Sequence, residues 1–158
     1  MTAYHKILVP LDDTEIGQRA LDLALRLAGL FEAGVVLLRV QPRPADLEAK
    51  QARKDLDAIE HSSRALLERA RARAKALGLT VEDLEVEIRA GKVVDAIVEA
   101  AEETMADLVV MGTHGRQGLA QLLTGSNTER VLARTTASVL AVKPVGYPYL
   151  RDDDTAED

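Results

Sequence analysis

Short apolar runs alternate with longer helical patterns along the chain, and this alternation constrains the fold more than any other feature. The apolar runs predict strands at residues 7–9, 35–40, 84–88, 108–111 and 139–142. The patterns between them predict helices at residues 15–31, 47–77, 93–103 and 126–134. Such alternation gives an open parallel sheet with helices on both faces. The 158 residues are enough for one domain of this kind.

Three segments add detail to this plan. Residues 84–88 alternate apolar and polar side chains with period two, which predicts a half-exposed strand at a sheet edge. Residues 47–77 contain no Gly or Pro and carry charges of both signs, which favours a solvated helix over a basic binding helix. Residues 1–145 are expected to form the domain, and residues 146–158 an acidic, disordered tail.

The composition limits the possible functions. The net charge of −6 argues against general nucleic-acid binding, which needs a basic face. Aromatic residues make up only 3% and Trp is absent, so base-stacking platforms are not expected. The absence of Cys rules out disulfides. The first apolar run, residues 7–11, is too short for a signal peptide, and no run is long enough to span a membrane, so we expect a cytoplasmic protein.

A glycine-rich stretch joins the fourth predicted strand to the last predicted helix. Its spacing is Gly112-x2-Gly115-x9-Gly125-Ser126. At the carboxyl end of a strand and the start of a helix, glycines let backbone N–H groups approach phosphate oxygens, and the helix dipole favours the negative charge. Isolated glycines are usually ordinary turn residues. The joint spacing, followed by a hydroxyl, favours phosphate binding.

At these residues the chain resembles the ATP-binding branch of the universal stress protein family, whose nucleotide loop is written G-x2-G-x9-G-[ST]. The segment Val9-Pro10-Leu11-Asp12 also carries the resemblance, which extends from about Tyr4 to Pro144. It implies a single-domain, Rossmann-like sheet of five parallel strands in the order 3-2-1-4-5. It also implies bound ATP, with Mg²⁺ held mainly by the phosphates and water. A homodimer is implied as well, in which the last strands, Val139 to Val142, meet antiparallel across a two-fold axis.

In that strand order the reversal falls between the first and fourth strands, where ligands of such sheets bind. Asp12 could accept hydrogen bonds from ribose hydroxyls or an adenine amine, or it could cap the first helix, with Glu15 three residues later. The backbone of Val40 could contact the adenine edge, as the resemblance implies, or Val40 could simply be a core residue. The predicted nucleotide-binding residues are Pro10, Leu11, Asp12, Val40, Met111, Gly112, Thr113, Gly115, Arg116, Gly125, Ser126, Asn127 and Thr128.

Polar residues of the glycine-rich stretch have competing interpretations. Ser126 and Glu129 match a capping box, which would use the Ser126 hydroxyl within the helix, although a capped terminus can still hold phosphate. Arg116 could pair with phosphate or lie in solvent. His114 has no identifiable nucleophile and no neighbouring ligands at metal-binding spacing, so we predict neither a catalytic residue nor a protein metal site.

The sequence lacks the groups that nucleotide hydrolysis uses. The P-loop pattern G-x4-G-K-[ST] is absent, because Gly91 and Lys92 are followed by Val93. Phosphates held by amides, without a lysine or a base, favour sensing or storage of the nucleotide over turnover. The predicted function is therefore a non-enzymatic regulatory or sensor module of the stress response that acts on an unidentified protein partner.

Two other classes of function were weighed. A receiver-type phospho-acceptor domain would use the paired acids Asp12 and Asp13, Thr113 and Lys143. However, the third strand ends at Ile88-Arg89-Ala90-Gly91, without the Asp that would accept the phosphoryl group. An enzyme that hydrolyses or transfers adenylate would need catalytic groups that we do not find.

Overall fold

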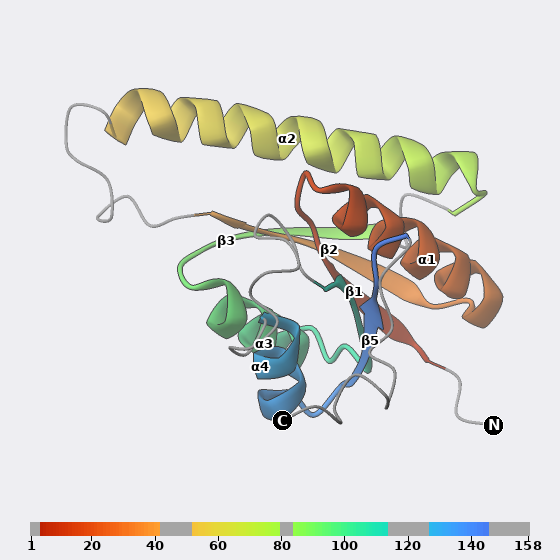
Figure 1. Ribbon diagram of the computed structural model, residues 1–158. Coiled ribbons are helices and arrows are strands. Elements are labelled where there is room, and N and C mark those ends of the chain that lie inside the picture. The colour runs from red at the N-terminus through yellow and green to blue at the C-terminus, as the bar shows by residue number, and fades with distance from the viewer. Residues whose placement is uncertain (1–3, 42–51, 80–83, 114–126, 146–158) are drawn as a thin grey trace, which may run out of the picture.

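The computed structural model describes residues 4–41, 52–79, 84–113 and 127–145, which form alternating strands and helices. Figure 1 shows their arrangement. In chain order the elements are β1 (Lys6–Pro10), α1 (Glu15–Phe31), β2 (Gly34–Gln41), α2 (Ala52–Ala76), β3 (Leu84–Ala90), α3 (Val93–Glu103), β4 (Leu108–Gly112), α4 (Asn127–Arg134) and β5 (Ser138–Val142).

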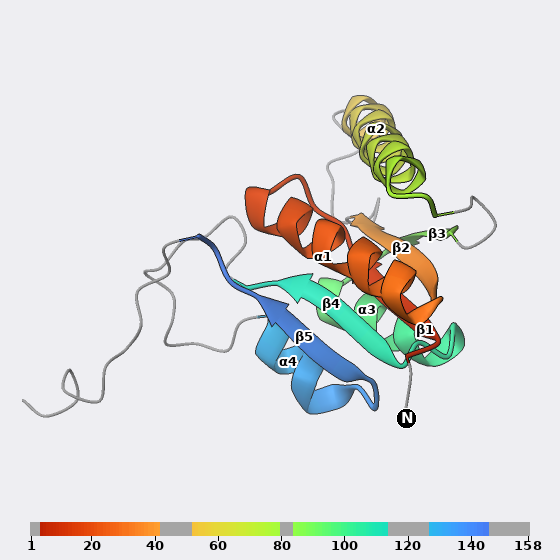
Figure 2. The same ribbon diagram turned by 90° about the vertical axis from the view of Figure 1, so that its right-hand side faces the viewer.

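The strands form one five-stranded sheet in the order β3-β2-β1-β4-β5, and every neighbouring pair is parallel. This confirms the predicted strand order, with β3 and β5 at the edges. Helices α1 and α2 cover one face of the sheet, and α3 and α4 cover the other (Figures 1 and 2). None of the helices in the described part of the chain has both the length and the hydropathy needed to cross a bilayer.

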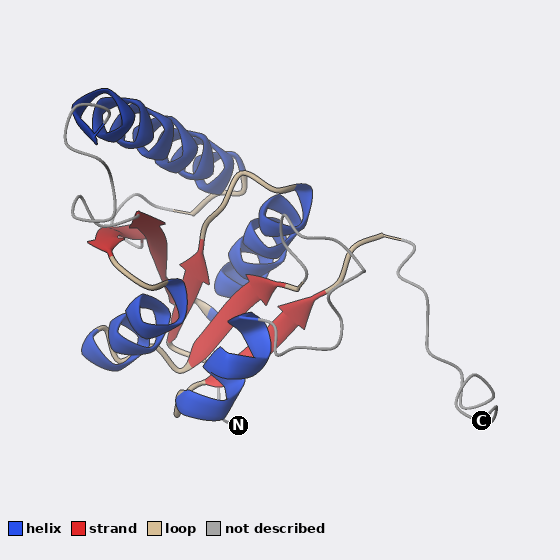
Figure 3. Ribbon diagram, turned by 60° about the vertical axis from the view of Figure 1, so that its left-hand side comes forward, coloured by secondary structure: helices blue, strands red, loops and turns tan. Residues whose placement is uncertain are grey.

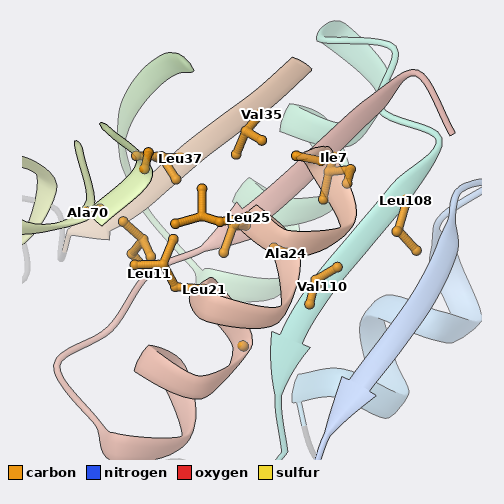
Figure 4. Packing of buried hydrophobic residues seen from close by; sticks show 14 of the residues in the cluster. Ile7, Leu11, Leu21, Ala24, Leu25, Val35, Leu37, Ala70, Leu108 and Val110 are labelled. Atoms are coloured by element: carbon orange, nitrogen blue, oxygen red, sulfur yellow. The ribbon is translucent and has the colours of Figure 1, made fainter. Parts of the chain in front are cut away.

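Two apolar clusters hold these layers together. Because successive side chains of a strand point to opposite faces, Ile7 and Val9 of β1 pack against α1 and α2, whereas Leu8 packs against α3 and α4. Figure 4 shows the first cluster, in which Leu21 and Leu25 of α1 lie among residues of the central strands. The central strands are buried on both faces, which explains why their sequences are continuous apolar runs.

The predicted elements agree with the observed ones to within a few residues at the ends that can be compared. Strand β3 extends to Ala90, beyond the predicted end at residue 88. Helix α2 ends at Ala76, one residue before its predicted end. The predicted start of this helix at residue 47, the start of the last helix at Ser126, and the proposed tail at residues 146–158 lie outside the described residues.

Candidate functional site

The reversal of strand order lies between β1 and β4, and the two strands separate there. Five residue pairs join β1 to β2, the last being Pro10 with Leu38. Only two pairs join β1 to β4, and the last is Leu8 with Val109. Both strands then continue to their carboxyl ends, and the arrowheads in Figure 3 mark the carboxyl end of every strand in the sheet. Adjacent strands that part at a switch point form the crevice in which open α/β sheets bind ligands.

Asp12 lies directly beyond β1 and organises the turn into α1. Its Oδ1 accepts hydrogen bonds from the Thr14 backbone N–H at 3.0 Å and from the Thr14 hydroxyl at 2.5 Å. Thr14 is the N-cap of α1 and accepts a hydrogen bond from the Gly17 N–H at 3.0 Å. The alternative in which Asp12 caps the helix is therefore wrong, because Thr14 takes that role. No described residue donates a hydrogen bond to Asp12 Oδ2.

Gly17 allows Asp12 to lie against the first turn of α1. A Cβ on Gly17 would come within 2.0 Å of Asp12 Oδ1 and 3.2 Å of the Thr14 hydroxyl oxygen. Gln18 adds a further contact, because its side-chain amide donates to the Asp12 carbonyl at 3.2 Å. The carboxylate is thus held in one position, two residues beyond the end of β1.

Gly112, the last residue of β4, brings the fourth strand close to the same turn. A Cβ on Gly112 would lie 2.5 Å from Ile16 Cγ2 and 3.2 Å from the Ile16 backbone carbon. The approach to the Ile16 side chain is closer than real Cβ contacts come, so a larger residue at position 112 would force Ile16 or β4 to shift. The end of β4, where the glycine-rich stretch begins, therefore packs against the first turn of α1, the turn that also carries Gly17.

Two predicted site residues, Thr113 and Thr128, use their hydroxyls within the fold. The Thr113 hydroxyl donates to the Val142 carbonyl at 3.2 Å, and its backbone N–H donates to the same oxygen at 2.8 Å. The Thr128 hydroxyl donates to the Gly112 carbonyl at 3.2 Å. Both side chains are buried. The Thr128 bond places the first turn of α4 beside the end of β4, and the Thr113 bonds tie the residue after β4 to the end of β5.

The backbone groups of Val40 point toward the side of β1, although its side chain packs against the second core cluster. Leu38 accepts a hydrogen bond from the Leu11 N–H at 2.8 Å, so its peptide groups point toward β1. The backbone N–H and C=O groups of alternate residues in a strand point to the same neighbouring strand. The backbone groups of Val40 therefore also point toward β1. β1 ends opposite Leu38, which leaves the edge of Val40 without a ladder partner on that side.

The other predicted site residues fall into two groups. Pro10, Leu11 and Met111 lie at the strand ends beside the crevice, where Leu11 and Met111 are buried, and Asn127 opens α4 with an exposed side chain. Gly115, Arg116, Gly125 and Ser126 lie outside the described residues, as does His114.

Arg39 is a residue of this region that the sequence analysis overlooked. Its Nη1 donates to the Leu11 carbonyl at 3.1 Å and supports the turn from the side of β2. The alternation of β2 could have identified it, because Val35 and Leu37 face the α1–α2 layer and Arg39 continues the same face with a charge.

The fold defines an open parallel α/β protein whose switch point lies between β1 and β4. The family model described as the universal stress protein family matches residues 3–143. The chain belongs to this family.

Relatives and solved structures agree with this assignment. A universal stress protein of Methanocaldococcus jannaschii is 33% identical over 144 residues, which cover 89% of this chain and 82% of the relative. The solved structure of the protein MJ0577 from the same organism has a TM-score of 0.81 at 26% identity, covering 92% and 99% of the two chains. A universal stress protein crystallised in complex with cAMP has a TM-score of 0.70 at 31% identity, covering 89% and 98%.

The observed topology also argues against the receiver alternative. Receiver-type sheets follow the order 2-1-3-4-5, in which the first and third strands are neighbours. Here β2 lies between β1 and β3, so the end of β3 cannot lie beside Asp12 and Asp13.

Proposed function

We propose that this protein binds ATP in the crevice between β1 and β4 and acts as a nucleotide-dependent regulatory module of the stress response. The observation that carries the proposal is the convergence of the Asp12 turn and the end of β4 at the switch point. Gly112 lies against Ile16 there, at the start of the G-x2-G-x9-G-[ST] motif. The relative crystallised with cAMP supports an adenine nucleotide as the class of ligand.

In this proposal the triphosphate lies along the glycine-rich stretch. Gly112, Gly115 and Gly125 give backbone N–H groups close access to phosphate oxygens, and Ser126, Asn127 and Thr128 contribute the start of α4. Thr113 lies at the base of the stretch. Arg116 adds a positive charge. The anchoring of Thr128 to the Gly112 carbonyl supports this arrangement, because it brings the helix start to the strand end.

The nucleoside lies on the β1 side of the crevice in the same proposal. Asp12 presents Oδ2 to the ribose hydroxyls or the adenine amine, while Oδ1 is held by Thr14. The backbone of Val40, which has no ladder partner on the side of β1, accommodates the adenine edge, as the family resemblance implies. Pro10, Leu11 and Met111 form the surrounding strand ends.

The proposal includes little or no turnover. Among the described residues, no group of three His, Cys, Asp or Glu side chains could hold a metal ion, so Mg²⁺ is placed on the phosphates. Without a lysine or a base at the phosphates, the protein would hold the nucleotide and signal its presence to a protein partner. A cytoplasmic location, where ATP is available, belongs to the same proposal.

Two measurements test the proposal. Mass spectrometry of the ligand released from purified protein should detect ATP, and calorimetric titration should show saturable binding of Mg·ATP, with cAMP and ADP as competitors. Phosphate release from Mg·ATP should stay close to the rate in buffer alone. A protein that neither carries nor binds any adenine nucleotide would refute the proposal, and several turnovers per minute would refute its non-enzymatic part.

A homodimer through β5 is the second part of the proposal. β5 pairs with β4 on one side only and lies at the edge of the sheet. Its apolar residues Val139 and Leu140 are only partly buried. An apolar edge strand with free backbone groups favours pairing with a second copy. Sedimentation equilibrium should show a dimer at micromolar concentration, and a monomer alone would contradict this part.

A further inference from the structure

A small polar cluster interrupts the apolar packing between β2 and α2. It consists of Arg39 and Gln41 of β2 and Ser63 of α2, which is completely buried. Arg39 Nε donates to the Ser63 hydroxyl oxygen at 3.4 Å, and Gln41 Nε2 donates to the same oxygen at 3.1 Å. Both donors lie on the face of β2 that carries Val35 and Leu37 closer to its start.

The cluster continues to the turn that carries Asp12. The same guanidinium that contacts Ser63 sends Nη1 to the Leu11 carbonyl at 3.1 Å. Leu11 is the residue before Asp12, and its own N–H is bound to the Leu38 carbonyl of β2 at 2.8 Å. Both backbone polar groups of Leu11 are therefore fixed by β2, one through the main chain and one through Arg39.

We infer that Arg39 is a positioning residue for the nucleotide: braced by Ser63 of α2, its guanidinium fixes the Leu11 carbonyl and thereby the direction in which Asp12 presents Oδ2. This inference rests on the proposed binding of ATP. Arg39 is half-buried, and its bond to the carbonyl is charge-assisted, so it is stronger than a bond between neutral groups. In this role Arg39 does not contact the ligand itself.

The chemistry of the guanidinium explains why Arg serves this purpose. Its N–H groups diverge in a rigid, planar fork and can contact Ser63 and Leu11 at once. A Lys side chain ends in one point charge and cannot reproduce both directions. Arg39→Met keeps the apolar stem and removes every donor, and Arg39→Lys keeps the charge and loses the fork.

The first experiment tests, in the absence of nucleotide, whether Arg39 holds the turn that carries Asp12. Backbone amide exchange by NMR should show faster exchange at Thr14 in Arg39→Met, because the Thr14 N–H is protected by Asp12 Oδ1. Arg73→Met is the matched control, because it also removes an Arg contact of α2, but one that pairs with Asp22 of α1, ten residues along the chain from Asp12. Unchanged Thr14 exchange in Arg39→Met would overturn the inference whether or not the protein binds ATP.

The second experiment is a double-mutant cycle on nucleotide affinity. Arg39→Met should weaken ATP binding about tenfold, as expected when Asp12 no longer accepts one well-oriented hydrogen bond from the nucleoside. In an Asp12→Ala background the same substitution should have no further effect, because the group that it positions is gone. Arg73→Met should leave ATP affinity unchanged in both backgrounds.

The affinity for inorganic tripolyphosphate distinguishes a loss of Asp12 positioning from a general destabilisation of the protein. Tripolyphosphate would engage the glycine-rich stretch alone, so its affinity should be the same in wild type and Arg39→Met. The positioning role would be overturned if Arg39→Met lowered the affinities for ATP and tripolyphosphate equally. It would also be overturned if Arg39→Met lowered ATP affinity by the same factor with and without Asp12. A wild-type protein that binds tripolyphosphate but not ATP would instead overturn the proposed function.

Discussion

Gly17 offers a direct test of Asp12 as a nucleotide-binding residue, because a single methyl group there would displace the carboxylate. The Cβ of Gly17→Ala would lie 2.0 Å from Asp12 Oδ1, whereas ordinary van der Waals contact begins at 3.4 Å. The carboxylate would have to move by about 1.4 Å. Such a shift breaks the 3.0 Å bond from the Thr14 N–H, because hydrogen bonds weaken rapidly beyond normal distances.

The expected changes in stability and affinity differ in size. Loss of a hydrogen bond to a charged group costs about 1.5–3 kcal/mol, while Ala in place of Gly stabilises a helix by up to about 1 kcal/mol. The net loss of about 0.5–3 kcal/mol lowers Tm by roughly 1–12 °C for a domain of this size. Asp12 would no longer present its free oxygen to the nucleoside, so ATP affinity should fall about 10- to 150-fold.

The assay compares Gly17→Ala with Gly29→Ala, a substitution in the same helix. A Cβ on Gly29 would meet no atom within 4 Å. Gly29→Ala should keep or raise Tm and leave ATP affinity unchanged in calorimetric titration. Amide exchange at Thr14 reports whether the carboxylate has moved. Faster exchange at Thr14 together with wild-type ATP affinity in Gly17→Ala would refute the role of Asp12.

Other substitutions test the remaining parts of the argument. Gly125→Val should abolish ATP binding while circular dichroism shows an intact fold; tight binding by the folded variant would mean that the stretch is only a turn. Leu140→Lys should shift sedimentation from dimer to monomer with little loss of Tm, because Leu140 is only partly buried and a Lys stem can reach solvent. Asp107→Asn should lower stability at pH 7 and reduce the difference in urea midpoint between pH 7 and pH 3. The reason is that the folded-state pKa of Asp107 lies below its ordinary value of 3.8. In the wild type, ionised Asp107 therefore stabilises the fold above that value, and this stabilisation is lost as the pH falls through the folded pKa. An equal midpoint difference in wild type and variant would contradict this.

The strands and helices could be predicted from the sequence because each carries a strong local signal. The central strands are continuous apolar runs, as expected for strands buried on both faces, and α1 shows a clear apolar stripe that includes Ala20 and Ala24. The strand order came from the family resemblance, since local patterns do not determine which strands become neighbours. The structure shows why β1 and β4 part: the ladder between them ends at Leu8 and Val109, before either strand ends.

The candidate site was less completely predictable. Asp12 and Gly112 were predicted from their places at the ends of the first and fourth strands, and the structure ends these strands at Pro10 and Gly112. The role of Thr14 as N-cap was missed, because Asp12 and Thr14 are both good capping residues and sequence alone does not choose between them. Gly17 was missed because its importance lies in a contact with Asp12 that only the folded turn creates.

The opposite end of the β1–β4 pair explains how the crevice can open without loss of the sheet. Asp107, just before β4, accepts hydrogen bonds from the His5 N–H at 2.8 Å and the Lys6 N–H at 3.1 Å, and its own N–H donates to the Lys6 carbonyl at 3.0 Å. Partial burial alone would raise the pKa of Asp107, but the hydrogen bonds from His5 and Lys6 outweigh it and lower that pKa. The Asp107 carbonyl also accepts the Ser138 N–H of β5 at 3.0 Å. Three strands are thus tied together where they begin, which leaves β1 and β4 able to separate only where they end, at the proposed nucleotide site.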